Sequence, residues 1–180
     1  METNENGLEG FETERLVGRE WREDDGEAAF AIYGDPEVML GLAREPEPDL
    51  ETQRENLLAA IARYRERPKG TGFWALERKE DGRVVGASVV KELPDDEGKF
   101  EVGWHVAREF WGNGYASEGA REAISIAFHH LPIERIHALV LPWNERSLKV
   151  CERLGFTRGE LTQRYYDSGL IEHWMSNPLR

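Results

Sequence analysis

Hydrophobic residues near the centre of the chain recur at every second position. Three such runs, at residues 72–78, 83–91 and 100–106, predict β-strands. The dipeptide Asp81-Gly82 between the first two runs is a strong signal for a hairpin turn. The pattern therefore predicts a sheet of about six to seven strands, the others being expected at residues 14–21, 135–140, 157–164 and 170–175.

Between these runs, apolar residues lie three and four positions apart, which is typical of helices. Expected helices are a short one carrying Ala29, Ile32 and Tyr33 and ended by Gly34-Asp35-Pro36, and longer ones at residues 50–67, 112–130 and 145–154. A strand–helix–strand crossover follows a run of hairpins. This order predicts an α/β fold: one mostly antiparallel, mixed sheet with helices on both faces.

Composition narrows the class of protein. The 180 residues suit one domain, expected at residues 13–180 after a flexible N-terminus at residues 1–12. The single cysteine, Cys151, excludes an internal disulfide and offers no pair for a metal site. The sequence contains neither a recognisable secretory signal nor an apolar run of the about 20 residues that a membrane-spanning helix needs. We therefore predict a cytoplasmic protein that does not contact a membrane.

The net charge of −12 bears on the partners of the protein. It argues against a general nucleic-acid binder, because phosphate contacts need a basic surface. The negative electrostatic field of the protein could also attract a cationic substrate such as an amine. Acidity also serves solubility alone, so this interpretation stays open.

The most informative segment is the turn Trp111-Gly112-Asn113-Gly114-Tyr115-Ala116, between a predicted strand and a predicted helix. Glycines there let the backbone approach an anion closely, and the N–H groups of the helix start point toward it. An ordinary helix start that binds nothing is the alternative. A dinucleotide fingerprint fails because Ser117 stands at its third glycine, and a nucleophile elbow fails because Tyr115 replaces a required glycine.

The phrase WGNGYASE at residues 111–118, followed downstream by Asn144, Ser147 and Leu154-Gly155-Phe156, resembles the acetyl-coenzyme A site of the GNAT N-acetyltransferases, in particular the RimJ/RimL-like branch. Gly114 and Ala116 match the last fixed positions of the family signature Gln/Arg-x-x-Gly-x-Gly/Ala. Trp111 departs from the Gln/Arg of that signature, although the branch often has an aromatic residue there. The resemblance implies a GNAT fold whose sheet is splayed between its fourth and fifth strands.

The resemblance also implies acetyl-CoA as cosubstrate, with no metal. The backbone of residues 112–116 would hold the pyrophosphate, Arg108 and Lys149 would add positive charge, and Asn144 would bind the pantetheine arm. Asn144 is equally well placed to cap the helix that follows it. The complete set of expected cofactor-binding residues is Trp104, His105, Val106, Arg108, Trp111, Gly112, Asn113, Gly114, Tyr115, Ala116, Asn144, Ser147 and Lys149.

The reaction implied is direct attack of an amine on the thioester, the acceptor being a protein N-terminus, a polyamine, an amino acid or an aminoglycoside. Glu101, Gly103 and His105 share one strand face, where Glu101 is the preferred general base and His105 a second candidate. Backbone N–H groups near Gly103 would stabilise the developing oxyanion. Ser147 is the candidate that stabilises the departing thiolate.

Each of these residues also has a structural interpretation. Glu101 could be a solvated strand residue, His105 a packing residue and Ser147 a helix cap. The aromatic residues Tyr165, Tyr166 and Trp174 could form the wall of a substrate cleft, but the preferred expectation is that they close the core. A non-catalytic acyl-CoA-binding module of the same fold is the alternative function. A homodimer is the possible assembly, as in relatives of the branch.

Overall fold

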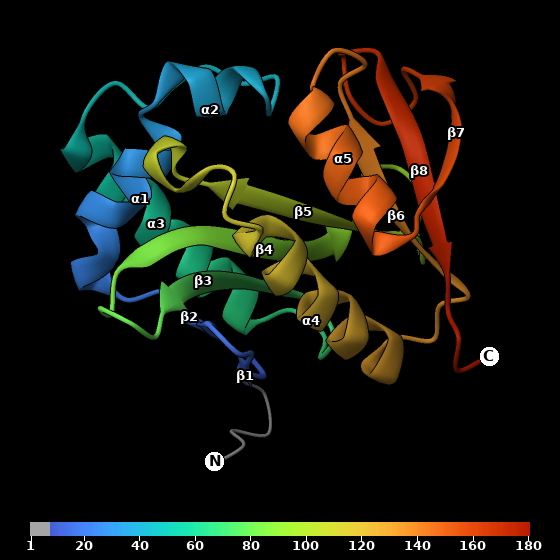
Figure 1. Cartoon of the computed structure of the whole chain (residues 1–180), viewed down its shortest axis with the longest axis horizontal. Helices are drawn as coiled ribbons and strands as arrows, with labels where there is room; N and C mark the ends of the chain where they lie inside the picture. The colour runs from blue at the N-terminus through green and yellow to red at the C-terminus, as the bar shows by residue number, and fades with distance from the viewer. Residues whose placement is uncertain (1–7) are drawn as a thin grey trace.

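The computed structural model describes residues 8–180, which form an 8-stranded sheet in the order β1-β2-β3-β4-β5-β6-β8-β7 (Figure 1). Within it only β5 and β6 are parallel. The strands are β1 Phe11–Glu12, β2 Leu16–Glu20, β3 Gly72–Arg78, β4 Val84–Glu92, β5 Phe100–Val106, β6 Arg135–Val140, β7 Thr157–Thr162 and β8 Leu170–Ser176. The mixed sheet is confirmed, with β1 as a strand that the sequence pattern did not predict.

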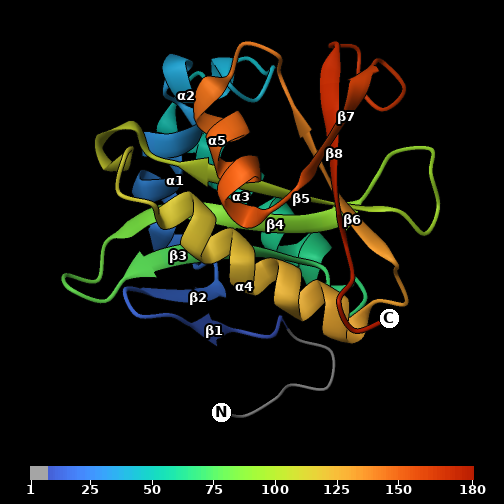
Figure 2. The ribbon, with the colours of Figure 1, turned by 45° about the vertical axis from the view of Figure 1, so that its right-hand side comes forward.

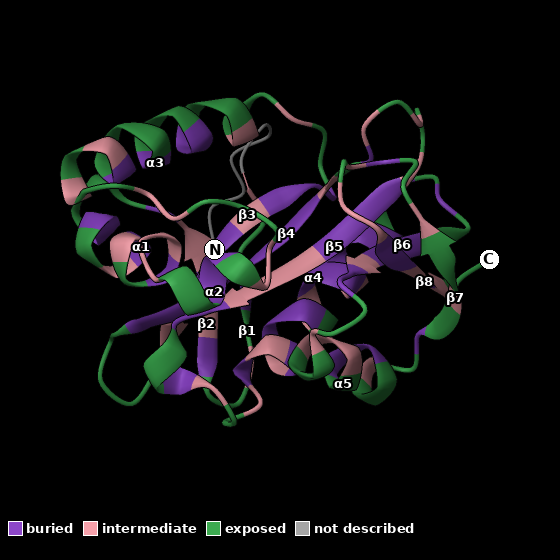
Figure 3. Ribbon diagram, turned by 90° about the horizontal axis from the view of Figure 1, so that it is seen from above, coloured by how far each residue is buried: buried purple, intermediate pink, exposed green. Residues whose placement is uncertain are grey.

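Helices cover both faces of this sheet. Figure 3 shows α1 and α3 on one side, and α4 and α5 on the other. Gly119 on α4 lets that helix lie close to the sheet, because a Cβ there would come within 2.7 Å of the Leu76 side chain. The helices are α1 Gly26–Tyr33, α2 Pro36–Leu40, α3 Leu50–Arg65, α4 Tyr115–His130 and α5 Glu145–Leu154.

Gly34-Asp35-Pro36 ends one helix and begins another. Gly34 caps the C-terminus of α1, and the Asp35 side chain then accepts a hydrogen bond of 2.8 Å from the Glu37 backbone N–H at the start of α2. Pro36 fits there because the first helical position needs no N–H donor. The sequence interpretation recognised the stop but missed the helix that follows it.

The N-terminal boundary also differs from the expected flexible segment at residues 1–12. Phe11 is buried and pairs with Gly18 in β2, and the Trp74 indole donates a hydrogen bond of 2.7 Å to the Glu9 carbonyl. Residues 1–7 of the expected segment lie outside the described residues. Phe11 and Glu12, at the end of the expected flexible segment, therefore belong to the sheet.

The sheet opens between β5 and β6. Their register contains only Phe100↔Ile136 and Glu101↔His137, so the two strands diverge beyond Glu101 (Figure 2). Residues 102–106 of β5 pair with β4 alone. The expected splay is therefore present, and it leaves one backbone edge of β5 without a strand partner. Among residues 8–180, no helix is both long and apolar enough to cross a membrane.

Candidate functional site

The glycine turn before α4 has the geometry of an anion site. Gly112 and Gly114 adopt φ values of 82° and 83°, a region that glycine enters without the strain imposed by a Cβ. Among the described residues, the backbone N–H groups of 112–117 donate no hydrogen bond. Six consecutive donors are thus available at the positive end of a helix, which suits a phosphate group.

Arg15, just before β2, contacts this turn and the first residues of α4 through its side chain. Its guanidinium donates to the Asn113 carbonyl at 3.0 Å and to the Glu118 carboxylate at 2.8 Å, and it lies 4.8 Å from the centre of the Tyr115 ring. Burial alone would raise the pKa of Glu118, but hydrogen bonds from Thr13 and Arg15 outweigh it and keep that pKa below its usual range. The sequence reasoning missed Arg15, since no local pattern links it to residue 113.

Trp111 and one of the expected cations, Arg108, lie beside the same turn. The Trp111 indole donates to the Val106 carbonyl at 2.8 Å, and the Arg146 guanidinium stacks 3.7 Å from the Trp111 ring centre. Arg108 instead pairs with Asp35 at 2.9 Å, so part of its charge is neutralised. Lys149 is exposed on α5. Arg146, not singled out from the sequence, is therefore a further cation beside the turn.

At the splay, the side chains of Asn144 and Ser147 contact the C-terminal end of α2 and the strand β5. The Asn144 side-chain oxygen accepts from the Ser147 backbone N–H at 3.2 Å, which makes Asn144 the N-cap of α5. Its amide nitrogen donates to the Gly41 carbonyl at 3.2 Å, and the Trp104 indole lies 3.4 Å from the Ser147 hydroxyl. These contacts connect α5, on one side of the splay, to α2 and β5 on the other.

Glu101 is a buried carboxylate with two partners. Its side chain faces Lys91, its neighbour on β4, whose ammonium lies 3.1 Å from Oε1. The Tyr166 hydroxyl donates to the same oxygen from the segment between β7 and β8. Oε2 accepts no hydrogen bond from residues 8–180. Glu101 is thus not a solvated strand residue but a held carboxylate with one free oxygen.

The comparisons with known proteins identify the family. A model of the acetyltransferase (GNAT) domain matches residues 15–157, most of the chain. The chain belongs to the GNAT family of acetyltransferases. It is 31% identical over 160 residues to YoaA of Bacillus subtilis (strain 168), named as an uncharacterized N-acetyltransferase, with 88% of this chain and 89% of YoaA covered. The protein is therefore an acetyl-transferring enzyme.

Solved structures support the GNAT fold. An acetyltransferase from Agrobacterium tumefaciens superposes with a TM-score of 0.77 at 25% identity, over 97% of this chain and 98% of the other. RimJ of Mycobacterium smegmatis, solved in complex with CoA-disulfide, superposes with a TM-score of 0.72 at 20% identity, over 89% and 81% of the two chains. The second likeness shows the fold alone.

His105 lies on the same face of β5 as Glu101, four residues further along the strand, but has a different environment. Its Nδ1 is 3.0 Å from the Tyr33 hydroxyl of α1. Burial, and then the positive charges of Lys91 and Arg44, lower the pKa of His105 to about 3. His105 is therefore neutral near pH 7 and has little tendency to take a proton, which leaves Glu101 as the stronger base candidate in this GNAT site.

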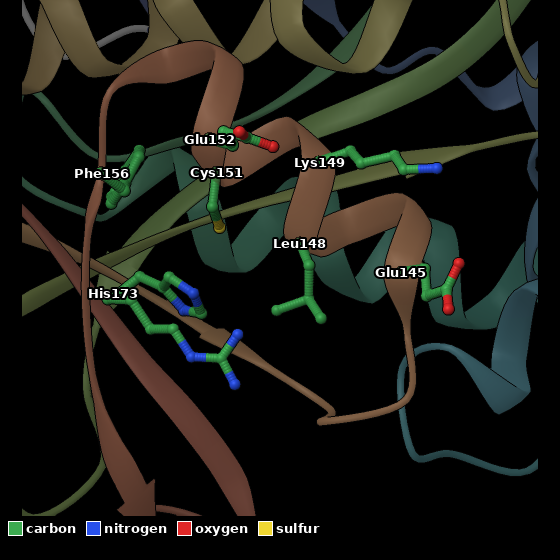
Figure 4. A pocket seen from close by; sticks show the side chains of 8 residues that line it. Glu145, Leu148, Lys149, Cys151, Glu152, Phe156 and His173 are labelled. Carbon is green, nitrogen blue, oxygen red and sulfur yellow. The ribbon is translucent and has the colours of Figure 1, made fainter.

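A cavity of about 360 Å³ lies between α5 and the strands β7 and β8. Figure 4 shows Leu148 and Cys151 pointing from α5 toward the strand that carries His173. Burial raises the pKa of the Cys151 thiol to about 12, so this cysteine is a poor nucleophile. Of the expected GNAT site residues only Lys149 borders the cavity. Within residues 8–180, no cluster of three or more His, Cys, Asp or Glu residues could hold a metal ion.

Proposed function

We propose that this GNAT enzyme is an N-acetyltransferase of the RimJ/RimL-like type, which transfers the acetyl group of acetyl-CoA to a primary amine with Glu101 as general base. The observation that carries the proposal is the buried Glu101 carboxylate beside the splay, with Oε1 held by Tyr166 and Lys91 and Oε2 free. A carboxylate in this state can accept a proton from an amine that arrives on the same strand face.

The residues around the splay fit acetyl-CoA, the donor that the GNAT family uses. The unpaired N–H groups of residues 112–117 suit its pyrophosphate, and Arg146 supplies positive charge nearby. The free edge of β5 offers backbone partners to the pantetheine amides. Asn144 could add a hydrogen bond there, in exchange for its present contact with Gly41.

Acetyl-CoA, when bound, supplies an acetyl carbon activated as a thioester. The amine must lose a proton, because near pH 7 most primary amines with a pKa of ~10 are protonated. Glu101 takes that proton, and the neutral amine nitrogen then bonds to the acetyl carbon. As the carbon–sulfur bond breaks, the nitrogen loses a second proton, which passes to the departing thiolate to give the free thiol. Backbone N–H groups near Gly103 stabilise the oxyanion charge, and the Ser147 hydroxyl stabilises the departing thiolate.

Two measurements test this proposal. Calorimetry with acetyl-CoA should show binding, and a panel of amines should release free thiol.

A substitution tests the role of the base. Glu101→Gln should lower kcat by ~100-fold with less than a twofold change in acetyl-CoA affinity, because general-base catalysis contributes about 10²–10⁴-fold to the rate. An unchanged pH–rate profile in that variant would exclude Glu101 as the base. Binding of CoA without acetylation of any amine would instead favour a non-catalytic acyl-CoA-binding module.

A further inference from the structure

The cavity between α5 and the strands β7 and β8 is separate from the site proposed for acetyl transfer. Its lining residues come from α5, the turn that follows it, β7 and β8, and not from β5 or the glycine turn. Its volume of about 360 Å³ is at the lower end of the range for small-molecule sites. Leu148, Cys151 and Phe156 form its apolar wall (Figure 4). A small ligand with an apolar body therefore fits this space.

Two polar side chains border the cavity on its strand side. Arg158 on β7 and His173 on β8 are partners in the antiparallel register. Their side chains therefore lie on the same face of the sheet, on strands about 4.8 Å apart. Arg158 is exposed, whereas His173 is buried with 3% of its surface exposed. A guanidinium and a buried imidazole thus lie side by side at one end of an apolar space.

The imidazole of His173 is a hydrogen-bond acceptor. Its Nδ1 lies 3.1 Å from the Ile171 carbonyl oxygen. Because a carbonyl oxygen only accepts hydrogen bonds, Nδ1 carries the hydrogen, and Nε2 is left as an acceptor. Burial lowers the pKa of His173, which keeps the ring neutral near pH 7. The cavity therefore offers a set of charged donors from Arg158 next to an acceptor from His173.

Charges of both signs border the same cavity. Glu145, Lys149 and Glu152 on α5 join Arg158 there. These four residues form no ion pair with any of residues 8–180, although Glu145 and Lys149 have the i,i+4 spacing at which helical pairs form. Two positive and two negative groups around an apolar space suit a ligand that carries both charges.

We propose that this cavity binds a free α-amino acid with an apolar side chain. Its carboxylate pairs with Arg158, whose planar guanidinium matches the geometry of a carboxylate. Its ammonium group donates to Nε2 of His173, and the negative charges of Glu145 and Glu152 favour that ammonium. Its side chain packs against the apolar wall. This inference goes beyond the proposed acetyl transfer, because no acetyl donor takes part in the binding.

Simpler ligands satisfy only part of this site. An apolar carboxylate without an amine would leave Nε2 of His173 without a donor and would meet the charges of Glu145 and Glu152. An apolar amine without a carboxylate would leave Arg158 unpaired. A polar amino acid would leave the apolar wall without a contact. The two charged groups of an α-amino acid are attached to one carbon, and so they are as close together as the donors and the acceptor on the adjoining strands.

Calorimetry with four small molecules tests the proposal. We expect leucine to bind with a Kd of about 1 mM or lower, which is the range open to a ligand of so few atoms. Leucinamide lacks the carboxylate, 4-methylpentanoate lacks the ammonium group, and glycine lacks the apolar side chain. Each should bind at least ~10-fold more weakly than leucine, because a hydrogen bond to a charged group, or the burial of such a side chain, contributes at least that factor.

Substitutions in the cavity provide a second measurement. Arg158→Gln should weaken leucine binding by ~10-fold or more and remove the preference for leucine over leucinamide. Leu148→Trp, which fills the cavity, should abolish the binding. Arg153→Gln is the matched control, because Arg153 is also exposed and lies on α5 but does not border the cavity. This control should leave the Kd of leucine within about twofold of the wild-type value.

Leucine is also an amine, so binding in this cavity has to be distinguished from binding beside Glu101. CoA carries no acetyl group, and it therefore occupies the proposed donor site without consuming leucine. Saturating CoA and the Glu101→Gln variant should each leave the Kd of leucine unchanged, whereas Arg158→Gln should raise it. Because acetyl transfer does not enter these measurements, the proposed function and this inference can fail separately.

Three results would overturn the inference. Leucine would fail to bind at about 10 mM, a concentration at which a site with a Kd of about 1 mM is mostly filled. Alternatively, leucinamide and 4-methylpentanoate would bind as tightly as leucine, or Arg158→Gln would leave the affinity unchanged. Finally, loss of leucine binding in the presence of CoA or in Glu101→Gln would place the amino acid beside the proposed base, as an acceptor, and not in this cavity.

Discussion

At the scale of single residues, Tyr166 positions the proposed base. Its hydroxyl donates to Glu101 Oε1, and hydrogen bonds to charged groups contribute about 1.5–3 kcal/mol. Tyr166→Phe should therefore lower kcat by ~10-fold with little change in the KM for acetyl-CoA. The pH–rate profile should also change in this variant, because Tyr166 contacts the group that is proposed to take the proton.

Tyr165→Phe is the matched control for that variant. Tyr165 belongs to the same segment, but its hydroxyl donates to Asp96 at 3.0 Å rather than to Glu101. Its loss should leave both kcat and the pH–rate profile unchanged. An equal loss of activity in the two variants would mean that Tyr166 only supports the shape of the segment.

His105 gives a residue-scale prediction about stability. Its pKa is about 3 in the folded protein and near 6.5 in an unfolded chain. Between these values only the unfolded chain binds the proton, so stability is fully present above pH ~6.5 and falls as the pH drops, by at most ~1.4 kcal/mol per pH unit. Urea unfolding between pH 4.5 and 7 should show a shallower loss in His105→Gln. If the free energy of unfolding falls equally with pH in the wild type and in His105→Gln, the lowered pKa of His105 is contradicted.

The sequence supported Glu101 as base but not the partners that hold it. Alternation along residues 100–106 was enough to place Glu101 and His105 on one face. Tyr166 was expected in the core, because nothing in the spacing relates it to position 101. The pairing of β8 with β6 brings its segment near β5, and such long-range pairing leaves no local signal.

At the scale of elements, the turn before α4 depends on a contact from Arg15, the residue just before β2. Arg15 donates to the Asn113 carbonyl and to Glu118, and so fixes the glycine turn to the first turn of the helix. Arg15→Gln should weaken acetyl-CoA binding by ~5–10-fold, because the N–H groups must then be ordered when the ligand binds. Calorimetry measures this loss directly, and kcat at saturating acetyl-CoA should change little.

Arg65→Gln provides the control at this scale. Arg65 also pairs with a glutamate, Glu20 at 2.7 Å, but it lies on α3, away from the turn. Exposed ion pairs contribute little to stability, so this variant should bind acetyl-CoA as the wild type does. If both variants lose affinity equally, a general effect of charge, rather than the order of the turn, explains the result.

The helices and strands that the sequence predicted most accurately were those long enough to show a full repeat of hydrophobic positions. The strands at residues 100–106 and 135–140 and the helix at residues 145–154 have the predicted bounds. By contrast, α2 spans five residues and β1 two, which is too short for a period to be visible. Both depend on tertiary contacts, such as the burial of Phe11 and Val38, that a local pattern cannot reveal.

At the scale of the whole molecule, the two parts of the splayed sheet are joined by side chains as well as by strands. Asn144 reaches Gly41, Arg146 stacks on Trp111, and Tyr166 reaches Glu101, each across the divergence of β5 and β6. Bound acetyl-CoA would add contacts to both parts at once. Binding to the folded state alone should therefore raise stability, by about 2.7 kcal/mol at 100 times the Kd.

Asn144 offers the test of this coupling. Asn144→Ala removes the cap of α5, at a cost of ~1 kcal/mol, together with the contact to Gly41. Thermal unfolding should show a lower Tm without ligand and, in addition, a smaller Tm increase on addition of acetyl-CoA. Asp49→Ala removes the cap of α3, outside the site, and should lower the Tm without changing the increase. If Asn144→Ala behaves like Asp49→Ala, then Asn144 is a helix cap only, and the coupling across the splay must come from the backbone of β5 and the glycine turn.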